Sequence, residues 1–426
     1  MNAHQATVLL FDLALILVVT RALGALATRL GQPAVIGEVL GGILLGPTLL
    51  HGTVARTLLP AEVRPYLAAL ANLGVALFMF IVGMELDRGL IKGRFRVAVS
   101  VSAGSIVLPL GMGMLLALYL APRHPTGDRL GFVLFMGAAL SVTAFPVLAR
   151  ILIDRNMHRS MLGSLALASA AIGDVLAWSL LAVVVAMVSG VMHWQLLFAV
   201  PFLLVMFLLV RPLLRRVLGA GTLTRTGFVV VLVGLLASGA LTEWFGLHFI
   251  FGAFLFGVVM PHDNPVLRAE ILAPLEQLSV TLLLPVYFVV AGTQVNLSAI
   301  GFAGIGELGL ILLAAIAGKF VGAFAGARAQ RVPPRDAAIL GTLMNTRGLT
   351  ELVILTVGLQ LAVLDTQLYS LMVVMALVTT AMAGPLLGLL HRTRSASNQQ
   401  IPPLTPSPRS PVPEETPHVE TPHLAE

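Results

Sequence analysis

The sequence predicts an all-α protein that crosses a membrane many times. Of its 426 residues, 58% are hydrophobic and only 11% are charged, and the mean hydropathy is +0.96, well above that of a soluble domain. The apolar residues gather in runs of roughly 17 to 28, the length range that a helix needs to cross lipid. Composition and run length together therefore indicate a polytopic helical membrane protein.

Thirteen apolar segments are predicted to be membrane helices. The first is too long for the core of a signal peptide and lacks a small-residue cleavage pattern, so we expect it to be retained. In chain order the segments lie near 6–27, 33–50, 67–87, 95–120, 130–152, 160–188, 193–210, 226–244, 247–262, 271–292, 301–327, 336–361 and 367–390.

Basic residues between these segments predict the orientation. If the N-terminus is outside, the inward loops and the tail carry 19 Lys and Arg, whereas the outward loops carry 4. Cytoplasmic loops of membrane proteins are enriched in basic residues. We therefore expect the N-terminus outside, the C-terminus in the cytoplasm, an odd number of helices, and the cell (inner) membrane as the location.

The composition argues against several classes of function. The chain has no cysteine, its 10 histidines lack metal-ligand spacing, and it contains neither a phosphate-binding loop nor a defensible Ser/His/Asp arrangement. The net charge of +6 comes from small basic clusters between apolar runs, which topology explains better than nucleic-acid binding. We expect no enzyme activity, no cofactor, no resident metal and no nucleic-acid partner.

Two short stretches suggest an internal duplication. VIGEVLGGILLGP at 35–47 and IFGAFLFGVVMP at 250–261 align with a spacing of 215 residues, with Gly37 over Gly252 and Gly42 over Gly257. Glycine-rich apolar helices are common, so chance similarity and a duplicated transporter are both compatible with this echo.

The end of the chain has a different composition from the rest. The last 26 residues contain eight prolines and repeat ETPH, a composition that cannot build a packed core. We therefore divide the chain into a transmembrane domain at 1–391 and a disordered, Pro-rich cytoplasmic tail at 392–426.

A single carboxylate stands in the middle of the apolar run ALASAAIGDVLAWSLLAVV. Counted from Ser160, Asp174 lies about 21 Å along a helix of about 42 Å, near the midplane of a bilayer. A charge there costs roughly 2.5–3.5 kcal/mol on insertion scales, so such residues mark functional sites more often than structural ones. A carboxyl in this setting can gain or lose a proton when its access to water or a cation changes.

A lone lysine has a similar place in GLILLAAIAGKFVGAFAGA. Lys319 is about 27 Å from the start of its segment and cannot reach either surface easily. It needs an anionic or carbonyl partner. A purely structural link between two helices and a direct part in transport both remain open for this residue.

Two segments are predicted to be interrupted helices. In ALSVTAFPVLARIL (139–152), Pro146 removes a backbone donor, and the hydroxyls of Ser141 and Thr143 are candidate ligands for an ion. Breaks at membrane depth are tolerated where they line a cavity, because the freed backbone groups need partners.

The second interrupted segment is GTLMNTRGLTELVIL (341–355), in which Asn345 to Gly348 break the apolar run. Arg347 and Glu351 stand at i and i+4, a spacing at which the two side chains can form a local ion pair. We favour that structural role for the pair.

Taken together, six stretches resemble the monovalent cation:proton antiporter-2 family, over about residues 7–390. They are LGVALFMFIVGMELD (73–87), ALSVTAFPVLARIL (139–152), ASAAIGDVLAW (168–178), GAFLFGVVMP (252–261), LLLPVYFVVAGTQVNL (282–297) and LMNTRGLTELVIL (343–355). The resemblance implies thirteen helices in two inverted repeats, with a dimerisation part, a mobile core and two crossing broken helices. A homodimer is implied as well.

By this resemblance, Asp174 is the carrier of cation and proton, and Lys319 is the basic residue opposite it. Pro146 and the stretch from Asn345 to Gly348 fall in the crossing helices. The chain departs from the family at Gly173, where members commonly have Asp or Asn, so that a second carboxylate or amide is missing beside Asp174.

The function predicted from the sequence is secondary active antiport of a monovalent cation, Na⁺ or K⁺, against H⁺ by alternating access, in an electroneutral cycle. A cation channel or regulated K⁺ efflux pathway on the same fold is one alternative. Another is an organic-anion symporter of related architecture, in which Lys319 or Arg347 would hold the substrate. A membrane sensor or assembly subunit without transport is a third.

Overall fold

The structure, a computed structural model, is all-helical in the part of the chain that it describes, with no strand in that part. The described residues are 2–48, 53–85, 95–124, 127–155, 157, 160–188, 198–218, 222–245, 248–261 and 264–398.

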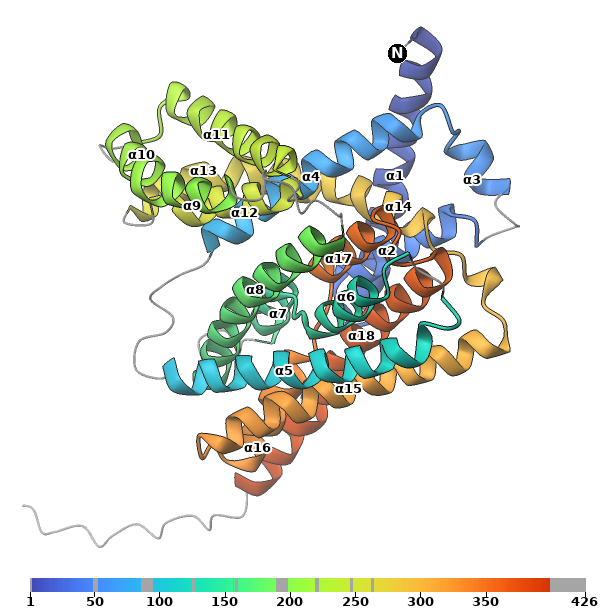
Figure 1. The fold of residues 1–426 in the computed structure, drawn as a ribbon, viewed down its shortest axis with the longest axis vertical. Helices are drawn as coiled ribbons and strands as arrows, with labels where there is room; N and C mark the ends of the chain where they lie inside the picture. Colours follow the sequence, from blue (N-terminus) through green and yellow to red (C-terminus); the bar gives the residue numbers. More distant parts are fainter. Residues whose placement is uncertain are drawn as a thin grey trace, which may run out of the picture.

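Helices of very different length make up the fold (Figure 1). In chain order they are α1 (Ala3–Arg29), α2 (Ala34–Leu45), α3 (Thr53–Leu58), α4 (Arg64–Glu85), α5 (Phe95–Leu120), α6 (Arg129–Ser141), α7 (Phe145–Asp154), α8 (Met161–Val188), α9 (Ala199–Val205), η4 (Met206–Val210), α10 (Arg211–Leu218), α11 (Arg225–Trp244), α12 (Phe249–Val259), α13 (Pro265–Leu278), η5 (Ser279–Leu283), α14 (Leu284–Thr293), η6 (Leu297–Ala299), α15 (Phe302–Ala329), α16 (Pro334–Met344), α17 (Leu349–Gln360) and α18 (Thr366–Asn398). The turns η4 and η5 are π-helical and continue the helices on either side.

All thirteen predicted segments coincide with helices. Eight helices in the described residues are long and apolar enough to cross a membrane, and shorter apolar helices occupy other predicted segments. The segments at 130–152 and 336–361 are each two short helices separated by non-helical residues, as their interruptions predicted. The protein is thus a multi-pass helical membrane protein.

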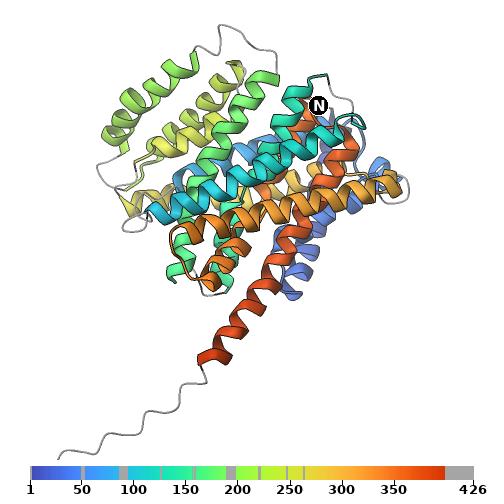
Figure 2. The ribbon, with the colours of Figure 1, turned by 60° about the horizontal axis from the view of Figure 1, so that its bottom comes forward.

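Two predicted boundaries differ from the structure. The segment expected to end at 210 continues through α10, because Leu214 and Leu218 are buried while Arg215 and Arg216 on the same helix are exposed. The last helix, α18, continues to Asn398, beyond the end predicted at 390 for the last apolar segment, and projects from the bundle in Figure 2. Residues 399–426 lie outside the described part.

The two halves of the chain repeat one pattern of helix packing. In the first half α1 packs on α2, and α5 packs on α6 and α8; in the second half α11 packs on α12, and α15 packs on α16 and α18. The halves also exchange equivalent contacts, since α2 packs on α14 and α12 packs on α4. In the described residues one helical run, from α9 to α10, lies between the two halves. The thirteen predicted segments then give six to each repeat and one to this run, so we expect the two repeats to enter the membrane from opposite sides.

Glycine contacts match between the repeats. A Cβ atom added at Gly37 would lie 2.1 Å from the backbone oxygen of Leu23, and one added at Gly252 would lie 2.1 Å from that of Ser238. Both pairs are separated by the same 215 residues as the aligned motifs. Gly42 and Gly257 likewise approach the backbones of α14 and α4. These equivalent close approaches make an internal duplication the better explanation of the sequence echo.

The long helices α5 and α15 lie side by side (Figure 1) and cross where Gly104 meets Gly322. A Cβ atom added to either glycine would lie 2.1 Å from the carbonyl oxygen of the other, so only glycine permits this contact. Around this pair are packed α6, α8, α16 and α18. The two broken helices and Asp174 therefore lie in one bundle.

Candidate functional site

The two helix breaks meet in the core of the bundle. The backbone N–H of Ala144, between α6 and α7, donates to the carbonyl oxygen of Thr346, between α16 and α17, at 3.1 Å. The Thr143 hydroxyl donates to the Met344 carbonyl, also at 3.1 Å. Residues about 200 positions apart are thus joined by their freed backbone groups.

Pro146 lies in the first turn of α7, after the break. At that position a helix has no acceptor for the missing N–H, so proline starts the second half-helix. At the other break, Asn345 caps the C-terminus of α16 and Gly348 caps the N-terminus of α17. A Cβ atom at Gly348 would lie 2.5 Å from Val147 Cγ2, so this glycine lets the two broken helices pack closely.

Lys319 of α15 reaches the first break. Its side chain is fully buried, and its ammonium donates to the carbonyl oxygen of Ser141 and, at 2.6 Å, to the hydroxyl of Thr143. The Ser141 hydroxyl donates to Ala138 O at 2.7 Å. The carbonyl partner expected for the lysine is therefore the C-terminal end of α6, where a cation also offsets the negative end of the helix dipole.

Arg347 binds the same helix end from the second break. It is fully buried, and its guanidinium donates to Ala139 O at 3.2 Å, to Leu140 O at 2.7 Å and to Glu351 Oε2 at 2.6 Å. The predicted i, i+4 ion pair is present. Thr380 of α18 holds the backbone of this arginine, with its hydroxyl 3.2 Å from Arg347 N and 2.7 Å from Arg347 O.

Asp174 of α8 differs from the other buried charges. Its side chain is 1% exposed, and neither carboxylate oxygen has a hydrogen-bond partner in the described part of the chain. Lys319 interacts electrostatically with Asp174, but its ammonium donates its hydrogen bonds to Ser141 and Thr143 at the first break. Asp174 is therefore a buried carboxylate that no neighbouring residue neutralises by direct contact.

Other buried oxygens of the same bundle also lack hydrogen-bond partners among the described residues. Native proteins pair most of their buried polar atoms, so a group of unpaired oxygens indicates a place where something else is bound. These oxygens are Ser102 Oγ, Asn345 Oδ1, Thr350 Oγ1 and Glu351 Oε1. Together with the Asp174 carboxylate they offer a proton or a cation oxygen ligands of the type that alkali ions prefer.

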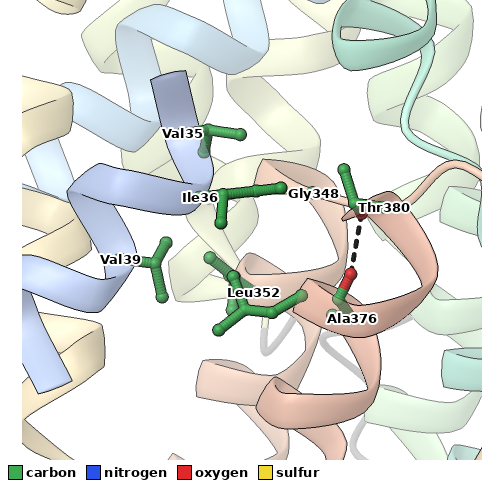
Figure 3. Close-up of a pocket in the computed structure, with 8 residues that line it drawn as sticks. Val35, Ile36, Val39, Gly348, Leu352, Ala376 and Thr380 are labelled. Atoms are coloured by element: carbon green, nitrogen blue, oxygen red, sulfur yellow. Dashed lines mark hydrogen bonds between the residues drawn. The ribbon is translucent and has the colours of Figure 1, made fainter. Parts of the chain in front are cut away.

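A narrow cavity of about 10 Å³ lies beside the second break, where α2 faces α17 and α18. That is barely room for one water molecule. Its lining is almost wholly apolar, and Figure 3 shows the Thr380 hydroxyl turned to Ala376 O, at 2.7 Å. The lining includes Val35, Ile36, Val39, Gly348, Leu352 and Thr380. A cavity of this size is too small for a hydrated ion.

A second polar cluster joins the loops after α5 and after α17 to the N-terminal part of α15, three places that are all predicted to lie on the outward side. His124 Nδ1 lies 2.6 Å from Asp365 Oδ2, and His124 Nε2 lies 3.1 Å from Glu307 Oε2. Arg123 Nε is 3.9 Å from Glu307 Oε1, and the Arg123 guanidinium lies 4.4 Å above the centre of the Tyr119 ring. We call the His124, Glu307 and Asp365 contacts the histidine clasp.

The histidine clasp shifts the pKa values of two of its members. The hydrogen bond to Asp365 raises the pKa of His124 above its usual value, against the opposing effect of burial. Burial alone would raise the pKa of Asp365, but hydrogen bonds from His124 and from the backbone of Leu368 lower it below its usual value.

Sequence reasoning missed the clasp, Ser102 and Thr380. Glu307 and Asp365 are 183 and 241 residues from His124, so no spacing in the sequence could reveal the contact. For Ser102, the one available signal was a group of three serines, Ser100, Ser102 and Ser105, in a mostly apolar span. The predicted site residues form two hydrogen-bonded groups at the C-terminal end of α6, one of Lys319, Ser141 and Thr143 and the other of Arg347 and Glu351. Asp174 has no hydrogen bond to either group in the described part of the chain.

Comparison with known proteins identifies the family. The sequence model of the family described as sodium/hydrogen exchanger, transmembrane, matches residues 14–392. The chain belongs to the sodium/hydrogen exchanger family. This confirms the resemblance drawn from the motifs.

Relatives within the family have different lengths. The Na(+)/H(+) antiporter NhaS4 of Synechocystis sp. is 36% identical over 91% of this chain and 98% of its own length. Cation/H(+) antiporter 20 of Arabidopsis thaliana is 36% identical over 94% of this chain but 50% of its own length. The K(+)/H(+) antiporter 1 of Saccharomyces cerevisiae is 32% identical, with 47% of its length matched. The chain thus spans about half of the two eukaryotic relatives and nearly all of the cyanobacterial one.

The fold is that of a solved exchanger. The sodium proton antiporter MjNhaP1 of Methanocaldococcus jannaschii is 14% identical, and the two structures have a TM-score of 0.66 over 92% of this chain and 98% of the other. At this identity the comparison supports the overall fold, and the function has to be argued from the residues of this chain.

Proposed function

We propose that the protein is a secondary active antiporter that exchanges a monovalent cation for H⁺, with Asp174 as the shared carrier. The observation that carries the proposal is the buried Asp174 carboxylate, which has no hydrogen-bond partner in the described residues and lies in the bundle of the two helix breaks. The names of the relatives, all cation/proton antiporters, support the same activity.

A single carboxylate explains how the two fluxes are coupled. It is neutral with a proton and neutral with a monovalent cation, but it carries a charge when empty, and moving a bare charge through a low-dielectric core is costly. The protein therefore changes its access from one side to the other with Asp174 occupied. One proton then moves against one cation, and the cycle carries no net charge.

The charged side chains near Asp174 are held in place by their own hydrogen bonds. Arg347 is neutralised by Glu351, and Lys319 is held by Ser141 O and the Thr143 hydroxyl. The lysine places a positive charge near Asp174, so it repels an approaching cation and is part of the electrostatic balance of the site. Thr143 supplies a further oxygen beside the site. Sodium or potassium is the substrate, since NhaS4 is named for Na⁺ and the yeast relative for K⁺.

We also propose that the protein lies in the cell (inner) membrane with its N-terminus outside and its C-terminus in the cytoplasm. The excess of basic residues in the inward loops supports this orientation. The histidine clasp agrees with it, because its three members lie in two loops and one helix end that are all assigned to the outward side. We expect a homodimer. On α1, Gly24 packs against α2 within the chain, so the exposed Leu10, Phe11 and Val18 are the better candidates for contact with a second copy.

The test of the proposed function is exchange by the purified protein in liposomes that enclose a pH-sensitive dye. Addition of Na⁺, K⁺ or Li⁺ is expected to drive proton movement in the wild type, with or without an imposed membrane potential. Asp174→Asn is expected to abolish exchange and to keep or raise the melting temperature, because it removes a buried, unpaired charge. Cation-dependent exchange by Asp174→Asn would rule out the assignment; exchange driven by the potential would contradict only the one-for-one cycle.

A further inference from the structure

Ser102 of α5 is a fully buried serine whose hydroxyl has no hydrogen-bond partner among the described residues. Two other serines of the same helix have partners: Ser100 Oγ donates to Gly326 O at 2.8 Å, and Ser105 Oγ donates to Ser102 O at 2.9 Å. A serine inside a helix can turn its hydroxyl back to the preceding turn, as Ser105 does. Ser102 does not.

The Ser102 hydroxyl faces α8 at the residue next to Asp174. A Cβ atom built on Gly173 would lie 3.6 Å from Ser102 Oγ, and no other heavy atom of the described residues outside the local helix is recorded within 4 Å of it. The absent side chain of Gly173 therefore leaves a gap about one methyl group wide between the hydroxyl and α8. The carboxylate of Asp174, one residue further on, also lacks partners.

The chemistry of the two groups is complementary for a cation. Asp174 supplies the charge and titrates, whereas a serine hydroxyl is a neutral oxygen donor that does not titrate in the working range of pH. A neutral ligand strengthens the binding of an alkali cation without adding a proton to the cycle. Both groups are buried, so an ion that binds between them sheds water and needs replacement oxygens.

We propose that the Ser102 hydroxyl is a ligand of the monovalent cation that binds at Asp174, and that Gly173 keeps the space between them free for that ion. The inference rests on the proposed function and assigns a specificity-determining residue to its site. Ser102 sets the affinity for the cation, while Asp174 alone carries the proton.

The experiment compares Ser102→Ala with Ser105→Ala as a matched control, because both serines are buried on α5 but the Ser105 hydroxyl is bonded to its own helix. In liposomes, Ser102→Ala is expected to raise the half-saturating cation concentration about tenfold, as for the loss of one neutral oxygen contact. The maximal rate and the pH midpoint should not change, and Ser102→Thr should recover part of the affinity. Ser105→Ala should behave as the wild type.

Binding is also measured without transport, as the rise in melting temperature when Na⁺, K⁺ or Li⁺ is added. The rise should shrink in Ser102→Ala and persist in Ser105→Ala. Unchanged half-saturation and unchanged thermal shifts in Ser102→Ala, with exchange lost in Asp174→Asn, would overturn the role of Ser102 and leave the proposed function standing. A shift of the pH midpoint without a change in half-saturation would also overturn it, since the hydroxyl would then act on the proton.

Gly173→Ala tests the space itself. The added methyl would make an ordinary contact with Ser102 Oγ, so we expect the variant to fold. It should raise the half-saturating concentration for K⁺ more than for the smaller Na⁺ and Li⁺. An equal effect on all three ions, or none on any, would contradict the role given to Gly173.

Discussion

The two helix breaks occupy equivalent places in the two repeats but are stabilised in different ways. The C-terminal end of α6 is bound by two cations: Lys319 reaches Ser141 O, and Arg347 reaches Ala139 O and Leu140 O. The C-terminal end of α16 is bound by hydroxyls, with Thr143 donating to Met344 O and Thr346 donating to Leu343 O. Charge stabilises the first break and neutral hydrogen bonds stabilise the second.

This difference shows how two repeats with the same helix packing can form a site whose charges are distributed asymmetrically between them. Both cations at the first break come from the second repeat, and the carboxylate of Asp174 comes from α8 in the first. The equivalent helix of the second repeat, α18, contains no Asp or Glu. The repeated helix packing therefore positions the two breaks. The charge distribution of the site comes from individual residues that differ between the repeats.

The largest expected effect is the loss of the guanidinium that joins the two breaks. Arg347→Ala leaves the buried Glu351 carboxylate unpaired and the carbonyls of Ala139 and Leu140 without their donor, which is expected to cost about 3–5 kcal/mol of stability. The measurement is thermal unfolding of the purified protein. The double variant with Glu351→Ala should lose less than the sum of the two single variants; strict additivity would contradict a coupled pair.

Loss of the ammonium at the first break is expected to have the next largest effect. Lys319→Ala should lower stability by about 1.5–3 kcal/mol, the range for hydrogen bonds to a charged group, and should impair exchange. Lys319→Arg keeps the charge but changes the geometry, so part of both should remain. If Lys319→Ala has the melting temperature and the exchange rate of the wild type, Lys319 neither stabilises the first break nor contributes to exchange.

The hydroxyl-stabilised break should tolerate substitution better. Thr346→Val removes the hydroxyl that donates to Leu343 O at 2.8 Å and is expected to cost about 0.5–1.5 kcal/mol. Thr20→Val is a matched control, because its hydroxyl also donates to its own helix but lies on α1, away from the breaks. If Thr346→Val lowers stability as much as Lys319→Ala does, the first break is not stabilised more strongly by charge than the second is by hydroxyl groups.

The histidine clasp should give the smallest effect, and one that depends on pH. It ties the loop before α6 to the loop after α17, so it restrains the outer ends of both broken helices. Because the pKa of His124 is raised above 6.5 in the folded protein, its contribution to stability is complete below pH 6.5 and is lost as the pH rises through the raised value. The lowered pKa of Asp365 has the opposite consequence, with loss only as the pH falls below 3.8.

His124→Gln should therefore lower the melting temperature by a constant amount between pH 3.8 and 6.5, and the difference should shrink at alkaline pH. Glu307 and Arg123 also face the ring or its partner, so Glu307→Gln serves as the second variant. A difference between wild type and His124→Gln that is the same at pH 6 and pH 9 would show that the clasp acts by packing alone.

The sequence by itself determined the membrane class, the thirteen helical segments, the two interruptions and the main charged residues. Each of these follows from local physics: apolar runs of membrane length, polar residues inside them, and the i, i+4 spacing of Arg347 and Glu351. Only the tertiary structure decided the partners, since Lys319 meets Ser141 and Thr143, His124 meets Glu307 and Asp365, and Ser102 faces Gly173. These contacts join helices that are distant in the chain, and which faces meet depends on how the two repeats pack against each other, a property that no local pattern contains.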